Sequence, residues 1–387
     1  MKIAGIIAEY NPFHNGHAWH IARTREAGCD AVVVCMGGHF TQRGEPATLS
    51  KWDRARMALA CGADAVFELP ALFAVRTADA FARGGVGVLS GVGADMLSFG
   101  SEIADLALLQ TVAALRDDEP EAVSAAIARK LEAGVSYARA WGEAVGEFLG
   151  VPAETLNRPN AVLAVEYLRT LKAGGSAMAP LAIPRRGDYR DEALGAFASA
   201  SAIRAAFARG DVDGALAAIP EPARPWAMPD ALHPMDDMLL VRLRGMSLGA
   251  LAALPDVGEG LEHRLYRLCR EAPGREALLD GLKCKRYTRA RLSRILTYAL
   301  LGIDRAALAA VPEPTYARLI GVRRGAEGLL GELKARSTLP IVSRAAALRG
   351  DPCFELECRA TDIWSLMHDD PRQRAAGREY TERFVVG

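Results

Sequence analysis

The sequence lacks any apolar run long enough to cross a membrane. No stretch reaches the roughly 18 uninterrupted apolar residues that a membrane-spanning helix needs. The apolar segment at residues 3–8 is too short for the apolar region of a secretory signal, and it ends at Glu9. We therefore expect a cytoplasmic protein with no membrane partner.

The sequence also lacks a cysteine framework. Its seven cysteines are scattered, odd in number and free of Cys-x-x-Cys spacing. Neither a set of disulfides nor a zinc site is indicated by this pattern. We interpret the cysteines as reduced and mostly buried, and we predict no resident metal.

The chain has no net charge, because its 47 Lys and Arg residues balance its 47 Asp and Glu residues. The balance is uneven along the chain. Residues 281–350 hold fourteen Lys or Arg against four Asp or Glu, a net charge of +10, so the rest of the chain carries −10. Clustered cations release counterions when they contact phosphates, so this region predicts a polyanionic partner.

A disordered chain is excluded, because 50% of the 387 residues are hydrophobic and 24% are charged. This length is enough for two or three domains. In the first hundred residues, short apolar runs alternate with helical patterns, which is typical of a parallel sheet with helices on both faces. The predicted strands are residues 3–8, 31–36, 65–69, 96–99 and, further along, 179–183.

Four prolines between residues 220 and 229 predict a linker. Beyond residue 236 the apolar spacing is almost entirely helical. We therefore predict an α/β protein in which a domain built on a parallel sheet, residues 1–230, precedes a mostly α-helical domain, residues 231–387.

One motif follows the first predicted strand directly. His14, Gly16 and His17 form the pattern His-x-Gly-His where a strand opens into a helix. Gly16 allows the backbone to approach a phosphate, and the helix N-terminus offers free N–H donors and a positive dipole. The two imidazoles could then stabilise charge on a phosphoryl group and a departing pyrophosphate. Two unrelated loop histidines are the alternative, which the glycine and the junction disfavour.

The His-x-Gly-His motif resembles that of the nucleotidyltransferase superfamily, which carries it at the first strand-to-helix junction of a Rossmann-like domain. A second element of that superfamily is a Ser/Thr-rich turn before a helix with an arginine, which binds the β- and γ-phosphates. Ser199, Ser201 and Arg204 resemble this element, with Ala200 at one of its small positions. Without the resemblance, a serine here is a helix N-cap and Arg204 a solvated helix residue.

Further segments resemble the bacterial tRNA(Met) cytidine acetate ligase family in the same order along the chain, from residue 1 to at least about residue 300. They are YNPFHNGH at 10–17, QRGEP at 42–46, KW at 51–52, ELP at 68–70, FGSE at 99–102, RPN at 158–160 and KRYTR at 285–289. The resemblance implies a nucleotidyltransferase-like domain joined to a largely helical domain that helps to hold tRNA. It implies activation of acetate by ATP, with Mg²⁺, as acetyl-adenylate, and acetylation of N4 of the wobble cytidine in elongator tRNA(Met). No obligatory protein partner is evident.

The resemblance also assigns single residues. His14 and His17 would be the catalytic pair at the phosphates, and Gly100 would lie against the nucleotide. Asn160 and Arg185 match positions that contact ATP, with Arg186 as the alternative to Arg185. The ATP-binding residues would be Ile7, Ala8, Glu9, Tyr10, Asn11, Pro12, Phe13, His14, Asn15, Gly16, His17, His20, Gly100, Asn160, Arg185, Ser201 and Arg204. Ala161 departs from the family, which tends to have a second asparagine there.

Two groups of cations remain. Arg43 and Lys51 are candidate phosphate ligands, although a surface loop cation and a first-turn helix lysine are equally good interpretations. The expected tRNA-binding residues are Lys283, Lys285, Arg286, Arg289, Arg291 and Arg294. Such contacts position RNA without reading its sequence. A solvated helix face is the alternative for them.

Two other functions remain open at this stage. One is nucleotidyl transfer to a small metabolite, which needs no RNA. The other is an RNA-binding module with a relic nucleotide site, which the intact His14, Gly16 and His17 disfavour.

Overall fold

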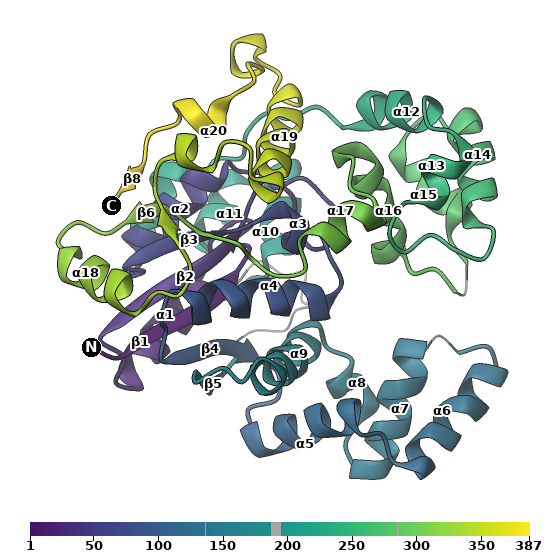
Figure 1. The fold of residues 1–387 in the computed structure, drawn as a ribbon, viewed down its shortest axis with the longest axis horizontal. Coiled ribbons are helices and arrows are strands. Elements are labelled where there is room, and N and C mark those ends of the chain that lie inside the picture. The colour runs from purple at the N-terminus through teal and green to yellow at the C-terminus, as the bar shows by residue number, and fades with distance from the viewer. Residues whose placement is uncertain (136, 187–194, 285) are drawn as a thin grey trace.

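A mixed, mostly parallel sheet forms the centre of the computed structural model, which describes residues 1–135, 137–186, 195–284 and 286–387 (Figure 1). The strand order is β5-β4-β1-β2-β3-β6-β7, and β8 pairs with β6. The strands are β1 (Ile3–Ala8), β2 (Ala31–Gly37), β3 (Ala65–Leu69), β4 (Met96–Ser101), β5 (Ala179–Pro184), β6 (Ala317–Val322), β7 (Ile341–Val342) and β8 (Val385–Val386).

The five predicted strands are confirmed as β1 to β5, and they pair in parallel. From β1 the chain builds outward through β2 and β3 and then crosses to β4 on the other side of β1. Ligands of open α/β sheets bind at such a reversal of strand order, beyond the carboxyl ends of the strands. The topology therefore places a binding crevice beyond β1 and β4.

Helices cover both faces of the sheet, as predicted. Successive residues of a strand point to opposite faces, and β2 shows this directly, since Val33 and Cys35 belong to one apolar core while Val34 and Met36 belong to the other. One face carries α3 (Ala71–Ala74), α4 (Ala78–Gly91) and α9 (Pro159–Ala173). The other carries α1 (Asn15–Glu26), α2 (Lys51–Ala60), α10 (Ala200–Ala208) and α11 (Val212–Ala217).

Two groups of helices project from the sheet on the same side (Figure 1). The first lies between β4 and α9 and consists of α5 (Leu106–Asp117), α6 (Glu121–Glu132), α7 (Tyr137–Leu149) and α8 (Ala153–Leu156). The second, which we call the helical lobe, consists of α12 (Asp236–Arg244), α13 (Leu248–Ala252), α14 (Leu261–Glu271), α15 (Arg275–Leu282), α16 (Arg289–Leu301) and α17 (Arg305–Ala310). None of the described helices is both long and apolar enough to span a membrane.

The proline-rich segment before the helical lobe is not entirely a free linker. Glu221–Trp226 forms a short 3-10 helix, η1, that packs against α2 and buries Ala223. Pro220 at its N-cap and the prolines within it restrict the backbone φ angle, so this part of the segment is rigid.

After α17 the chain returns to the sheet, which the sequence pattern did not predict. β6 pairs antiparallel with β3, and the chain then continues through α18 (Glu327–Arg336), α19 (Pro352–Leu366) and α20 (Arg378–Thr381) to β8. The region after residue 230 is therefore not one helical unit, although a domain boundary there stays a prediction. Leu319, Gly321 and Val322 of β6 pair with a strand some 250 positions earlier, and a contact so distant leaves no local pattern in the sequence.

A buried cluster of charges holds β6 and the C-terminal helices against α2 and β3. The Lys51 ammonium at the start of α2 contacts the carboxylates of Glu68 on β3, Glu357 on α19 (3.0 Å) and Glu379 on α20. Arg318 on β6 contacts Glu68 (3.0 Å) and Glu379. All five side chains are buried. We call these five residues the charge cluster.

Lys51 is a first-turn lysine of α2, as the alternative interpretation held, but it is buried in the charge cluster and does not line the cavity described below, so the interpretation as a phosphate ligand was wrong. Burial alone would lower the pKa of Lys51, but its three carboxylate partners together raise it. Burial, with the neighbouring Glu68, raises the pKa of Glu357 to about 7. A proton on Glu357 would offset the excess of three carboxylates over two cations.

Replacing Lys51 with methionine should strongly destabilise the fold, because three carboxylates would then face Arg318 alone. We expect a loss of about 3–5 kcal/mol in the free energy of unfolding, the usual effect of removing one partner from a buried ion pair. Denaturant unfolding measures it. The loss should shrink at pH 5, where the orphaned carboxylates accept protons more readily.

The matched control is Lys130→Met, which removes a lysine that bridges Glu143 and Glu147 on the surface. Solvent screens that pair of contacts, so its loss should be much smaller. Equal losses in the two variants would contradict a special role for the charge cluster.

Candidate functional site

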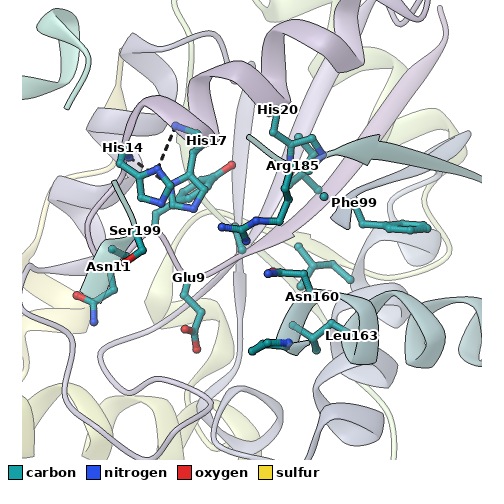
Figure 2. Close-up of a pocket in the computed structure, with 18 of the residues that line it drawn as sticks. Glu9, Asn11, His14, His17, His20, Phe99, Asn160, Leu163, Arg185 and Ser199 are labelled. Atoms are coloured by element: carbon teal, nitrogen blue, oxygen red, sulfur yellow. Dashed lines mark hydrogen bonds between the residues drawn. The ribbon is translucent and has the colours of Figure 1, made fainter. Parts of the chain in front are cut away.

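A cavity of about 250 Å³ opens beyond the carboxyl ends of β1, β4 and β5, where the strand order predicts a crevice (Figure 2). Its walls come from the segment after β1, from α1, from residues 41–45, from the start of α9 and from the start of α10.

Most of the residues expected to bind ATP line this cavity. They are Ile7, Ala8, Glu9, Tyr10, Asn11, His14, Gly16, His17, His20, Gly100, Asn160, Arg185, Ser201 and Arg204. Pro12, Phe13 and Asn15 do not line it. Phe13 is fully buried with its ring 4.8 Å from that of Tyr10, and Asn15 donates its side-chain N–H to the carbonyl of Ala196 at 2.8 Å. These two hold the segment in place instead of facing the cavity.

His14 and His17 stack at the start of α1, with ring centroids 3.7 Å apart (Figure 2). The Gly16 N–H donates to Nδ1 of His14 at 3.0 Å, and the His14 N–H donates to Nδ1 of His17 at 3.2 Å. Since Nδ1 is an acceptor in each ring, a neutral imidazole must carry its proton on Nε2. The helix N-terminus thus fixes both rings as Nε2–H donors.

These histidines are neutral at physiological pH. Burial, helped by the charge of Arg185, lowers the pKa of His14 to about 3 and that of His20 to about 4. Burial also lowers the pKa of His17 well below its usual value. An anion in the cavity would therefore receive neutral N–H donors from the imidazoles, and positive charge from arginines and the helix dipole.

Gly16 is required by the packing of His14. A Cβ at position 16 would lie 2.9 Å from Cε1 of His14, closer than real Cβ contacts come. The motif by itself indicated only room for a phosphate. At Gly100, by contrast, an added Cβ would meet only Cγ of Arg185 at 3.4 Å, so the protein's own packing does not demand a glycine there.

The wall beside the histidines carries fixed charges. The Gln42 N–H donates to Glu9 Oε1 at 2.6 Å, and burial raises the pKa of Glu9. Arg204 donates to the carbonyl of Asn11 at 2.6 Å, and burial lowers its pKa. Arg204 is thus not a solvated helix residue. Ser199 is the N-cap of α10, as the alternative interpretation held, and its hydroxyl lies 3.1 Å from that of Ser201.

The opposite wall presents an amide and a guanidinium. Asn160 donates from Nδ2 to Glu102 at 2.7 Å, and the backbone N–H of Ala161 donates to the other oxygen of Glu102 at 2.9 Å. Figure 2 shows Arg185 between Asn160 and the histidines. The neighbouring Arg186 instead stacks on Trp19, 3.8 Å from the ring centroid. Both arginines line the cavity, so Arg185 as the one that contacts ATP stays a prediction.

Gln42 and Glu45, from the QRGEP segment, also line the cavity. Several other lining residues were not singled out from the sequence, among them Thr41, Leu163 and Tyr167. Nothing in their local pattern distinguishes them from ordinary helix and loop residues. Arg43 was weighed as a phosphate ligand, and it does line the cavity.

The expected tRNA-binding cations lie in the helical lobe, and the fold brings acids to several of them. Arg286 pairs with Glu259 at 2.8 Å, and Arg289 pairs with Asp280 at 2.8 Å. Lys283 is exposed. Lys285 lies outside the described residues.

Arg291 and Arg294 are half-buried and face Asp256. Arg291 donates to the carbonyl of Asp256 at 2.6 Å and stacks on Tyr287, whereas Arg294 lies 3.9 Å from the carboxylate of Asp256. The residues whose exposure suits an RNA backbone are therefore Lys283, Arg286 and Arg289 among those described.

Known proteins resemble the chain over its whole length. A sequence model of the family described as HIGH Nucleotidyl Transferase matches residues 1–379. The tRNA(Met) cytidine acetate ligase of Syntrophotalea carbinolica is 41% identical over 95% of this chain and 94% of its own length. The enzyme of that name from Bacillus subtilis is 34% identical over 96% of this chain and 94% of its own length.

Solved structures of Thermotoga maritima TmcAL share the fold. The one bound with alpha-thio ATP is 29% identical and superposes with a TM-score of 0.90, over 100% of this chain and 99% of that chain. The apo form superposes with a TM-score of 0.91 over the same shares. The α/β nucleotidyltransferase fold expected from the sequence is thereby confirmed.

Spectra of ¹⁵N-labelled histidine should show His14 and His17 as neutral Nε2–H tautomers at pH 5.5, because backbone N–H groups occupy both Nδ1 atoms and burial opposes protonation. His14→Gln and His17→Gln assign the signals. An imidazolium signal or an Nδ1–H tautomer from either ring at pH 5.5 would contradict the geometry.

The same burial gives a pH-dependent stability. In the unfolded chain a histidine gains its proton near pH 6.5, whereas folded His14 stays neutral to about pH 3. The unfolded state therefore binds more protons between these values, and stability falls as pH drops. His14→Gln should reduce that slope by about 1.4 kcal/mol per pH unit between roughly pH 6 and pH 4, measured by denaturant unfolding.

Proposed function

This chain belongs to the tRNA(Met) cytidine acetate ligase family, and we propose that its cavity uses ATP to activate acetate for transfer to a tRNA cytidine. The observation that carries the proposal is the pair of Nε2–H donors fixed at the start of α1, with Arg185 and Arg204 on the walls of the same cavity. This set of donors suits a polyphosphate whose negative charge moves during reaction.

Acetate must be activated first, because a carboxylate is a poor acyl donor and the exocyclic amine of cytosine is a poor nucleophile. An acetate oxygen attacks the α-phosphorus of ATP, and the bond from that phosphorus to the bridging oxygen of the β-phosphate breaks. The products are acetyl-adenylate and pyrophosphate. His14 and His17 donate to the phosphoryl oxygens as their charge changes, and Arg185 and Arg204 supply positive charge.

Transfer then takes place on the mixed anhydride. N4 of the wobble cytidine of elongator tRNA(Met) attacks the acetyl carbon, the bond from that carbon to the phosphate oxygen breaks, and AMP leaves while N4 gives up a proton. Only the first step draws on the chemistry of the nucleotidyltransferase fold. The second needs RNA delivered to the cavity.

Mg²⁺ enters this scheme with ATP as part of the substrate. Among the described residues, the one group of ligand atoms close enough to share an ion is His39, Glu357 and Glu379. The Lys51 ammonium already sits against both carboxylates of that group. That group therefore does not fit a resident metal ion, and no step is assigned to one.

The exposed cations Lys283, Arg286 and Arg289 are proposed to contact the RNA backbone, since they stand at the start of α16 and just before it. Such contacts position RNA without reading sequence. ATP, acetate and tRNA are cytoplasmic substrates, in keeping with the proposed cytoplasmic location.

Acetyl-adenylate should form without tRNA, because all the residues that line the cavity precede the helical lobe, which carries the expected tRNA-binding cations. Mass spectrometry of a quenched reaction with enzyme, Mg²⁺, ATP and acetate measures it. His17→Ala should reduce acetate-dependent pyrophosphate release by about 10²-fold or more, the usual effect of losing a transition-state donor.

His263→Ala is the control, since that histidine is exposed on α14. It should release pyrophosphate at the wild-type rate. Absence of acetyl-adenylate from the wild-type reaction would overturn activation without RNA, and wild-type release by His17→Ala would make that histidine structural.

The triple variant Lys283→Ala, Arg286→Ala and Arg289→Ala should weaken binding of all tRNAs alike. The slope of log affinity against log salt should flatten by roughly 0.7–0.9 for each RNA phosphate that a removed cation no longer neutralises. Fluorescence titration across a salt series measures both, and acetyl-adenylate formation should survive.

A control triple of exposed cations elsewhere, Arg129→Ala, Lys172→Ala and Arg209→Ala, carries the same change in net charge. If both triples bind tRNA with equal affinity and slope, the RNA surface lies elsewhere, with Arg323, Arg324 and Lys334 the next cations to test.

A further inference from the structure

A short loop joins the cavity to the helical lobe. Residues 41–46, here the 41–46 loop, contribute Thr41, Gln42, Arg43 and Glu45 to the cavity wall. The backbone of its turn faces away from the cavity and rests on α16. One wall of the nucleotide cavity is thus supported by a helix some 250 residues later in the chain.

The support consists of donors that converge on two carbonyls. The Gly44 carbonyl accepts from Arg275 at 3.3 Å, and the Thr297 hydroxyl lies 2.8 Å from this carbonyl and 3.1 Å from that of Ser293. The Ser293 hydroxyl lies 2.5 Å from the Arg43 carbonyl and 2.9 Å from the Gly44 carbonyl, and it has one proton to give to either. Ser293 and Thr297 are buried, so no water replaces these bonds when a hydroxyl is removed.

The backbone of Gly44 packs directly against the backbone of α16, with no space for a side chain. Its φ of +70° is in the left-handed region, and an added Cβ would lie 2.7 Å from the backbone of Ser293 and Arg294. Two bonds also close the turn, from Gly44 N–H to the Thr41 carbonyl at 2.9 Å and from Thr41 N–H to the Glu45 carbonyl at 2.8 Å. A turn closed in this way moves as a unit if its contact with α16 loosens.

The other side of the loop meets the end of β1. The Gln42 N–H donates to Glu9 at 2.6 Å, and the charge of Arg43 acts on both Glu9 and Arg204. The Arg43 side chain therefore contributes positive charge to the cavity, and α16 holds its backbone carbonyl.

We propose that Ser293 and Thr297 are positioning residues that hold Arg43 where it contacts an oxyanion of a bound substrate, either a phosphate of ATP or the carboxylate of acetate. The inference rests on the proposed function. It deepens that function by making part of the catalytic cavity depend on the helical lobe.

The test is acetate-dependent exchange between ATP and labelled pyrophosphate, with KM measured separately for ATP and for acetate. Ser293→Ala combined with Thr297→Val should lower kcat/KM about 10- to 100-fold, the usual effect of a small misplacement of a catalytic group. Arg43→Ala should change the same constant. A rise in the KM for ATP identifies a phosphate contact, and a rise in the KM for acetate identifies a carboxylate contact.

Two comparisons separate positioning from general destabilisation. Thr297→Ser keeps the hydroxyl, so it should have wild-type kinetics where Thr297→Val does not. Adding Arg43→Ala to the Ser293 and Thr297 double variant should cause little further loss, because both changes remove the same interaction. The control is Ser337→Ala, which removes a hydroxyl that holds the carbonyls of Gly91 (2.9 Å) and Leu339, neither of which lines the cavity.

The inference is overturned if the double variant loses stability but keeps wild-type exchange kinetics, or if its loss multiplies with that of Arg43→Ala. Thr297→Val alone answers the question if the double variant does not fold. A wild-type enzyme with no acetate-dependent exchange would instead defeat the proposed function. Calorimetric affinities for ATP and for acetate then decide the inference, which fails if Arg43→Ala and the double variant bind both ligands as the wild type does.

Discussion

The charge cluster around Lys51 is the constraint on which the rest of the structure depends. It joins residues of α2, β3, β6, α19 and α20 through ion pairs that water cannot replace. Desolvated charges tolerate few arrangements, because each carboxylate that loses its cation becomes a buried, unpaired charge. The edge of β3 and the C-terminal helices are thereby fixed against α2. One turn further along that helix, the buried Arg54 donates to the carbonyls of Glu9 (2.5 Å) and Gly37 (3.0 Å), so the rigidity reaches the cavity.

In the cavity, different residues supply the directed hydrogen-bond donors and the positive charge, whereas a charged histidine pair would supply both. Backbone N–H groups hold His14 and His17 in one tautomer and burial keeps them neutral, so they supply direction and not charge. Arginines supply the charge from the other walls, where Arg185 and Arg204 line the cavity. A site built in this way keeps its donors in place whatever the pH within the ordinary range.

The parts of the fold that follow from local sequence were predictable. Apolar runs located β1 to β5 to within about two residues, and the His-x-Gly-His pattern located the cavity, because a strand, a turn and a helix start are neighbours in the chain. Distant contacts were not predictable. β6, the burial of Lys51 and the acids beside Arg286 and Arg289 all depend on segments that meet only after folding. Arg43 and Lys51 illustrate the limit, since both followed the same reasoning and only Arg43 lies at the cavity.

The return of the chain to β3 has a consequence for the order of folding during synthesis. A ribosome delivers β1 to β5 first, yet β3 lacks its outer neighbour, and Glu68 lacks Arg318, until β6 emerges more than a hundred residues after β5. The nascent sheet therefore has an unpaired edge at β3 until then, the kind of exposed edge through which incomplete chains associate. The helical lobe is synthesised between β5 and β6, so the sheet is completed only after the lobe has left the ribosome.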